Sequence, residues 1–133
     1  MKSILLLAFA LLLPVAALAD APADATAAAK VWLALVDKGD FAQSWKDASG
    51  LMQARVSAAD WAKAVAAIHE QLGPVVSREP AGADMMKSLP GAPDGDYAIV
   101  HFKTKFQKKA DAKETVTMML DGGKWKCAGY FIQ

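Results

Sequence analysis

The sequence contains one cysteine, Cys127, and two histidines, His69 and His101. A single cysteine excludes an internal disulfide and leaves two interpretations: a disulfide with another chain, or a small apolar residue in the core. The two histidines fall far apart in the predicted fold, so they form neither a metal site nor a catalytic pair. The sequence also lacks a serine–histidine–aspartate order, a glycine-rich phosphate loop and metal-ligand spacing. We therefore expect no cofactor, and no motif identifies an enzyme.

The sequence has little net charge, +1 with the histidines neutral. This balance excludes a general attraction to nucleic acid, which is not expected as a partner. The charges are unevenly placed, because residues 101–133 carry seven lysines against three acidic residues. A local basic face is compatible with this distribution.

The long apolar run of the sequence lies at its N-terminus. Lys2 precedes an unbroken apolar run over residues 4–13, and Ala17-Leu18-Ala19 matches the A-x-A pattern of a cleavage site. This pattern predicts that residues 1–19 are a secretory signal peptide. A retained N-terminal anchor is the alternative, but the uncharged stretch of 17 residues is shorter than the roughly 20 residues that a spanning helix needs.

Cleavage after Ala19 leaves residues 20–133 as a single domain of 114 residues, with 14 basic and 14 acidic residues. A chain of this length buries about two-thirds of its unfolded surface. We expect this domain to be periplasmic or secreted, with no stable membrane anchor after cleavage.

Apolar residues with helical spacing predict three helical segments in the first half of the domain. We expect Asp24 to cap the first segment and Gly39 to end it, Asp40 to cap the second, and Ser57 to begin a third that stops at Gly73-Pro74. The apolar stripes of these segments include three tryptophans, so we expect core packing rather than ligand stacking for Trp32, Trp45 and Trp61.

Alternating apolar residues predict strands in the second half. The expected strands cover residues 75–79 with a weak extension toward Met86, 97–106, 114–120 and 124–132, and a loop covers Leu89–Asp96. The fold class is therefore α+β, with N-terminal helices packed on a curved antiparallel sheet of about four strands.

Turns set the expected register of the last three strands. A two-residue Gly122-Gly123 turn pairs Leu120 with Trp125, Met118 with Cys127, Val116 with Gly129 and Glu114 with Phe131. A three-residue loop at Lys109–Asp111 places Phe102 opposite Met118 and Thr104 opposite Val116. In this register Cys127 points into the core, which favours the interpretation as a small apolar residue.

Glu114 is the carboxylate that this register makes most informative, because it lies on the core face, opposite Phe106 and Phe131. A carboxylate there must be paired, solvated at the rim or shifted in pKa. Arg78, on the first strand, is the natural partner. The pair is either a structural ion pair or the floor of a ligand or substrate pocket.

Tyr97 and Tyr130 are expected on the outer face of the sheet, with Lys103, Lys105 and Lys126. A face that mixes aromatics with lysine stems is either an ordinary solvated face or an interface. If the face is an interface, we expect a homodimer that forms through it.

The segments "VWLALVDKGDFAQSWKDAS", "LGPVVSR", "SLPGAPDGDYAIVHFKTKF", "KETVTMML" and "GKWKCAGYFI" resemble the family of small exported bacterial proteins called domain of unknown function 4019. The resemblance covers essentially all of residues 20–133. Cys127 stands where the family pattern has an aliphatic residue, which agrees with a core position. The resemblance implies no activity. The order of helices and strands is also similar to the cone of nuclear-transport-factor-two-like and cystatin-like proteins, a fold that hosts enzymes and binding modules alike.

Two hypotheses follow for the function. The first is a non-enzymatic exported module that binds a partner protein, a second copy of itself or a small ligand. The alternative is a small-molecule hydrolase or isomerase that uses Glu114 in a pocket of the cone. The absence of a base–nucleophile pair favours the first hypothesis.

The cleavage pattern generates a direct prediction. Protein recovered from the exported fraction is expected to begin at Asp20, because the A-x-A pattern ends at Ala19. Intact-mass measurement checks this, and a soluble exported form that retains Met1 would contradict it.

Overall fold

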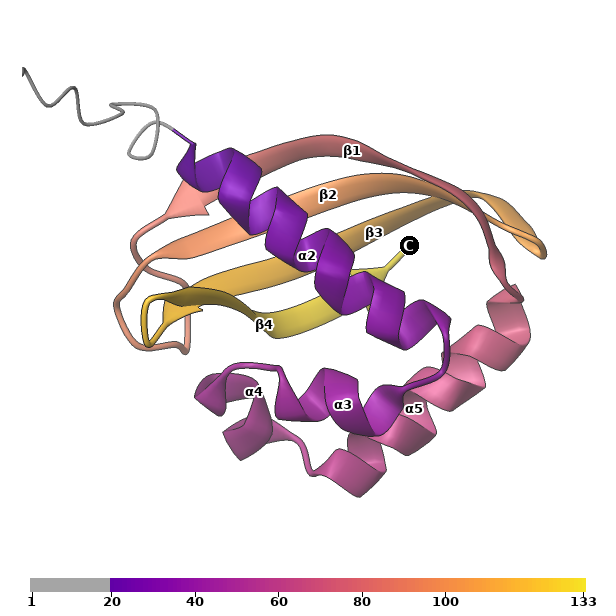
Figure 1. The fold of residues 1–133 in the computed structure, drawn as a ribbon, viewed down its shortest axis with the longest axis horizontal. Helices are drawn as coiled ribbons and strands as arrows, with labels where there is room; N and C mark the ends of the chain where they lie inside the picture. The colour runs from indigo at the N-terminus through magenta and orange to yellow at the C-terminus, as the bar shows by residue number, and fades with distance from the viewer. Residues whose placement is uncertain (1–19) are drawn as a thin grey trace, which may run out of the picture.

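The computed structural model describes residues 20–133, and the predicted signal peptide lies outside these residues. The described residues form an α+β fold, which confirms the predicted class (Figure 1). Its helices are α2 (Ala21–Asp37), α3 (Phe41–Lys46), α4 (Gly50–Arg55) and α5 (Ala58–Leu72), and its strands are β1 (Val75–Met86), β2 (Tyr97–Phe106), β3 (Lys109–Asp121) and β4 (Lys124–Ile132).

The four strands form one antiparallel sheet in the order β1-β2-β3-β4. In Figure 1, α2 crosses one face of this sheet, and α3, α4 and α5 lie together beyond the β4 edge. Within residues 20–133, no helix is both long enough and apolar enough to cross a membrane. The likeness to the nuclear-transport-factor-two cone stays an expectation.

Helix α2 begins earlier than the sequence predicted. Asp20 precedes its first residue and Pro22 lies in its first turn, where proline is tolerated because its missing N–H has no helical partner. Asp24 is therefore inside the helix, and its N–H donates to the Asp20 carbonyl at 2.8 Å. Gly39 follows the helix with a positive φ of 80°, as expected of a residue that ends a helix.

The second predicted helical segment is two short helices, because Ser49 interrupts it. Ser49 adopts an extended conformation, with φ −64° and ψ 157°, and its side chain caps α4 by accepting from the Met52 N–H. Its own N–H donates to the Cys127 carbonyl at 2.8 Å, which ties the break to the edge strand β4. The predicted cap of the next helix is confirmed, since the Ser57 hydroxyl accepts from the Asp60 N–H at 3.1 Å.

The turn between β2 and β3 lies at Gln107 and Lys108 rather than at the predicted loop of residues 109–111. The N–H groups of Gln107 and Lys108 donate to the carbonyls of Pro74 and Leu72, both at 2.9 Å. These bonds hold the turn against the connection between α5 and β1.

The earlier turn changes the partners across β2 and β3. Phe102 pairs with Glu114 and Thr104 pairs with Ala112, so the predicted partners Met118 and Val116 were wrong.

The Gly122-Gly123 turn is confirmed, and it pairs Leu120 with Trp125 and Met118 with Cys127 as predicted. Beyond these pairs the register shifts at a β-bulge, so the predicted pairs of Val116 with Gly129 and Glu114 with Phe131 are wrong. Val116 pairs instead with Tyr130, Thr115 with Phe131 and Glu114 with Ile132. One extra residue in a strand exchanges the two faces. Tyr130 therefore turns toward the core, and Phe131 turns outward and is 58% exposed.

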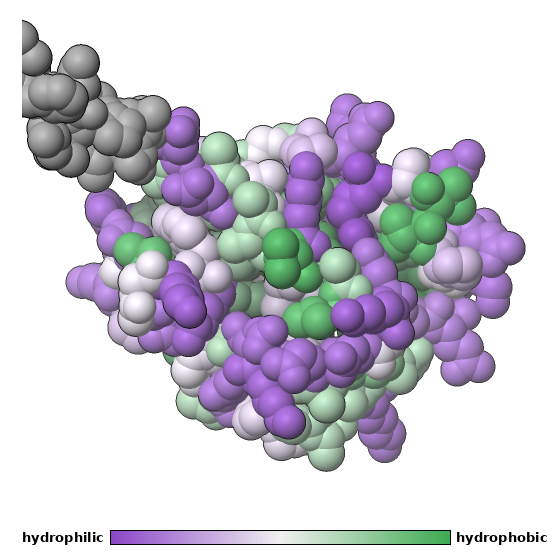
Figure 2. Space-filling view, viewed as in Figure 1, coloured by the Kyte–Doolittle hydropathy of each residue, from purple (hydrophilic) through white to green (hydrophobic). Residues whose placement is uncertain are grey.

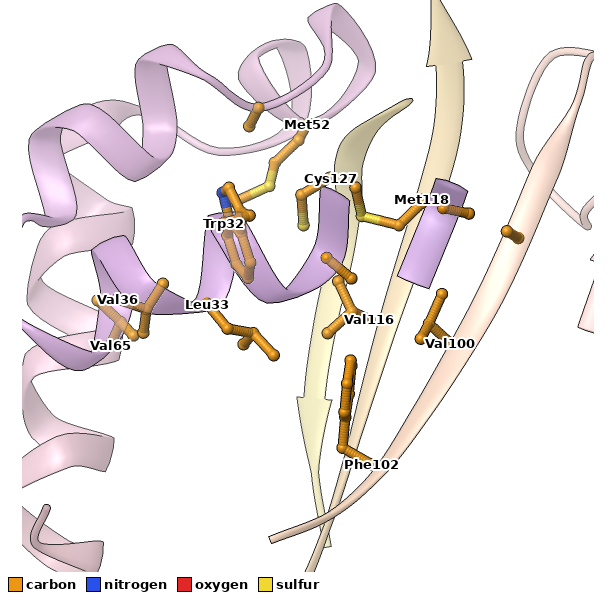
Figure 3. Packing of buried hydrophobic residues seen from close by; sticks show 14 residues of the cluster. Trp32, Leu33, Val36, Met52, Val65, Val100, Phe102, Val116, Met118 and Cys127 are labelled. Atoms are coloured by element: carbon orange, nitrogen blue, oxygen red, sulfur yellow. The ribbon is translucent and has the colours of Figure 1, made fainter. Parts of the chain in front are cut away.

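The core lies between α2 and the sheet and includes Cys127, whose side chain has no exposed surface. Figure 3 shows Cys127 pointing into this cluster beside Met118, its partner across the strands. Burial raises the pKa of the Cys127 thiol to about 12. The core interpretation of the single cysteine agrees with this geometry. The labelled members of the cluster are Trp32, Leu33, Val36, Met52, Val65, Val100, Phe102, Val116, Met118 and Cys127.

A buried thiol with a raised pKa presents little reactive thiolate at neutral pH. We expect maleimide to label Cys127 slowly in the native protein and rapidly after denaturation. Cys127→Val is expected to change the free energy of unfolding by less than about 1.5 kcal/mol, because it conserves volume and apolarity. Rapid labelling of the native protein, or a disulfide-linked dimer on a non-reducing gel, would contradict the core position.

Candidate functional site

Glu114 is the centre of a group of polar side chains that we call the Glu114 network: Asp37, Arg78, Thr104, Glu114 and Tyr130. The members come from the end of α2 and from all four strands. The pairing of Arg78 with Thr104 across β1 and β2, and of Val116 with Tyr130 across β3 and β4, brings them to one region on the core side of the sheet.

Each oxygen of the Glu114 carboxylate accepts two hydrogen bonds. Oε1 accepts from Arg78 Nε at 2.7 Å and from the Thr104 hydroxyl. Oε2 accepts from Arg78 Nη2 at 3.2 Å and from the Tyr130 hydroxyl. The Glu114 side chain has no exposed surface. A carboxylate has about four acceptor positions, so these donors fill the acceptor capacity of the group.

Arg78 connects the buried carboxylate to a second one nearer the surface. Its Nη1 and Nη2 donate to the two carboxylate oxygens of Asp37 at 2.7 and 3.0 Å. Asp37 is in the last turn of α2, where the helix dipole disfavours a negative charge, and the guanidinium compensates for this position. Burial alone would lower the pKa of Arg78, but the hydrogen bonds to Asp37 and Glu114 raise the pKa above its ordinary value.

Tyr130 closes the network on the side of the helices. Its ring makes edge contacts with Trp32 and Trp61 at centroid distances of 5.5 and 6.5 Å. Burial, and then the negative charge of Glu114, raise the pKa of Tyr130, which keeps the phenol protonated as a donor. The indole N–H groups of Trp32 and Trp61 donate to the carbonyl and the hydroxyl of Ser44, so the aromatic wall is itself fixed.

The predicted pair of Arg78 and Glu114 is therefore present, with three partners that the sequence reasoning missed. Tyr130 was expected on the outer face, and the bulge in the β3–β4 register makes that expectation wrong. Thr104 offered a signal, because it is a polar residue on the apolar face of its predicted strand. Asp37 offered none, since a carboxylate before a helix-ending glycine is usually solvated.

Tyr97 was also expected to be exposed on the outer face, and it is buried without any exposed surface. It alternates with the core-facing residues of β2, but the loop before β2 folds over its ring, and its hydroxyl donates to the Pro93 carbonyl. Tyr97 is therefore not part of the Glu114 network. Because it is buried, it cannot contact a partner in this conformation.

A second feature is an apolar groove between α2 and β4, which we call the α2–β4 groove. It has a volume of about 510 Å³, and its apolar lining residues are Ala28, Val31, Trp32, Leu35, Met118, Trp125 and Cys127. Lys46, Lys124 and Lys126 line it together with one carboxylate, Asp47. Figure 2 shows green apolar side chains near the middle of this face, bordered by purple hydrophilic ones.

The family model for "Protein of unknown function (DUF4019)" matches residues 28–130. The chain belongs to this family. The resemblance seen in the sequence is thus confirmed, and the matched residues include most of α2, all of β1, β2 and β3, and β4 as far as Tyr130. The comparison with curated proteins gives no match. The function of this DUF4019 chain must therefore be argued from its site.

The outer sheet face of the DUF4019 domain differs from the expected one. The exposed aromatic residue there is Phe131, which pairs with Thr115, whereas Tyr97 is buried and Tyr130 lies on the core side. A homodimer through this face stays a prediction. Sedimentation of Phe131→Ser beside the wild type tests it, because loss of a dimer in the variant alone is the expected result.

The geometry predicts that the Glu114 network stabilises the DUF4019 fold. Glu114→Gln is expected to lower the free energy of unfolding by about 2–4 kcal/mol, because it leaves Arg78 short of a buried charged partner. Arg78→Met should cost at least as much, since it leaves two carboxylates without their cation. In a double-mutant cycle by urea unfolding, the combined change should be smaller than the sum.

Glu79→Gln, an exposed change on the same strand as Arg78, is the control and should lie within about 0.5 kcal/mol of the wild type. Should a variant fail to fold, Asp37→Asn supplies a milder measurement, because the Asp37 side chain is 30% exposed. Additive effects in the cycle, or a stabilising Glu114→Gln, would contradict a structural network.

Proposed function

We propose that this DUF4019 chain is an exported, non-enzymatic binding module, periplasmic or secreted, whose binding site is the α2–β4 groove. The observation that carries the proposal is the combination, in one hollow, of apolar walls that include the exposed Val31 with a lysine rim. Ligand sites are concave, mostly apolar and marked by a few polar groups, and their volumes are about 300–1,000 Å³. The groove, at about 510 Å³, fits this description. Export rests on the sequence pattern of residues 1–19.

The Glu114 network supports a binding module over the alternative hydrolase or isomerase. A general base needs a carboxylate oxygen within reach of a substrate proton. Both oxygens of Glu114 are occupied by Arg78, Thr104 and Tyr130, and the side chain has no exposed surface. Catalysis by Glu114 would first require this network to open.

A neutral, polarity-sensitive dye such as Nile red tests the groove without assuming the charge of the natural ligand. We expect its fluorescence to rise with the wild-type protein. Val31→Gln should weaken dye binding about tenfold, because the loss of a valine contact is worth about 1.5 kcal/mol. Val31 is 71% exposed, so the change is compatible with the fold.

Val76→Gln is the matched control, because Val76 is 59% exposed on β1, away from the residues of the groove. It should bind the dye as the wild type does. Absence of dye binding to the folded protein, or equal binding by both variants and the wild type, would overturn the groove as the binding site.

A further inference from the structure

Helix α2 carries more apolar surface than its place in the core requires. Its buried residues are Ala25, Ala29, Trp32, Leu33 and Val36. A second apolar stripe, Ala28, Val31 and Leu35, has the spacing i, i+3, i+7 and faces the groove. At about 100° per residue, the two stripes together cover an arc of about 200°, roughly twice the usual width.

The second stripe is partly open to solvent, because Val31 is exposed while Ala28 and Leu35 are half-buried. Val31 is the most exposed of the large hydrophobic residues in the described part of the chain, at 71%. From Ala28 to Leu35 the wall is about 10 Å long, at about 1.5 Å per residue. The facing wall is the half-buried Trp125 from β4, behind which the buried Met118 of β3 forms the floor. An unbranched alkyl chain of about ten carbons matches a wall of this length.

The rim of the groove is basic, although the charges of residues 20–133 balance. It has three ammonium groups, on Lys46, Lys124 and Lys126, and one carboxylate, on Asp47. The Asp47 carboxylate already accepts from the Gln43 side-chain amide at 2.8 Å. Within residues 20–133, the three ammonium groups take part in none of the ion pairs.

These lysines border the groove on two sides. Lys46 ends α3, whereas Lys124 and Lys126 belong to β4. Lys126 is half-buried, so its alkyl stem has apolar neighbours while its ammonium group can reach water. An anion placed at this rim would meet positive charge without displacing an existing partner.

We infer that the α2–β4 groove binds a single-chain amphiphile with an anionic head, the tail lying along Ala28, Val31 and Leu35 and the head between the lysines. The inference rests on the proposed function and names its ligand class. The head is a carboxylate, as in a fatty acid, or a phosphate, as in a lipid fragment, because both satisfy the same ammonium groups.

Three ligands with the same ten-carbon tail test the inference: decanoate, decyl phosphate and decanol. Calorimetry, with tryptophan fluorescence as a second signal because Trp125 lines the groove, measures each affinity in the purified protein. We expect both anions to bind about fivefold to tenfold more tightly than decanol, from two or three partly solvated ionic contacts. The preference should shrink as salt is added. The tighter of the two anions identifies the head group.

A double variant that combines Lys124→Gln and Lys126→Gln should bind the two anions about fivefold more weakly and bind decanol as the wild type does. Lys103→Gln with Lys105→Gln is the matched control, because it removes the same charge from exposed positions of β2 and should change nothing. Val31→Gln should weaken all three ligands, since it alters the wall that the tail contacts.

The experiments distinguish a wrong ligand class from a wrong binding site. Equal affinity for the three ligands, or insensitivity to the Lys124 and Lys126 changes, would overturn the anionic head while dye binding still supported the groove. Dye binding that depends on Val31, with none of the three ligands bound, would overturn the single-chain amphiphile. Loss of dye binding as well would overturn the proposed function itself.

Discussion

The burial of Glu114 is the constraint on which this structure depends. A carboxylate removed from water is costly unless charged or hydrogen-bonding groups surround it. The chain meets that need with donors from β1, β2 and β4, and Arg78 extends the network to Asp37 at the end of α2. The same contacts that neutralise the buried charge therefore fix the position of the helix relative to the sheet.

The β-bulge in the β3–β4 pairing makes this arrangement possible. Without the extra residue, Tyr130 would face outward, and Phe131 would occupy the core side beside a carboxylate that it could not satisfy. With it, the phenol of Tyr130 reaches Glu114, and its ring packs against Trp32 and Trp61. The network and the α2–β4 groove meet at Trp32, whose ring packs against Tyr130 and also lines the groove. The network holds the fold together, whereas the groove leaves the apolar side chain of Val31 exposed.

Local patterns in the sequence predicted the α+β fold, the Gly122-Gly123 turn and the pair of Arg78 with Glu114. They missed features set by distant contacts. The only local sign of the bulge is Gly129, and that sign is weak. The bulge is favoured by the contact of Tyr130 with Glu114, which are distant in the sequence. The burial of Tyr97 depends on a loop closing over it, and alternation within β2 cannot show that. The groove could not be predicted from the helix alone, because its facing wall and its lysine rim come from α3, β3 and β4.

The most direct measurement of the central claim is the unfolding of Tyr130→Phe by urea. The variant keeps the ring and its contacts with the tryptophans, and removes only the hydroxyl that donates to Glu114. We predict a loss of about 1.5–3 kcal/mol, the range for a hydrogen bond to a charged group. A free energy of unfolding equal to or above that of the wild type would contradict the claim that the buried carboxylate organises the fold.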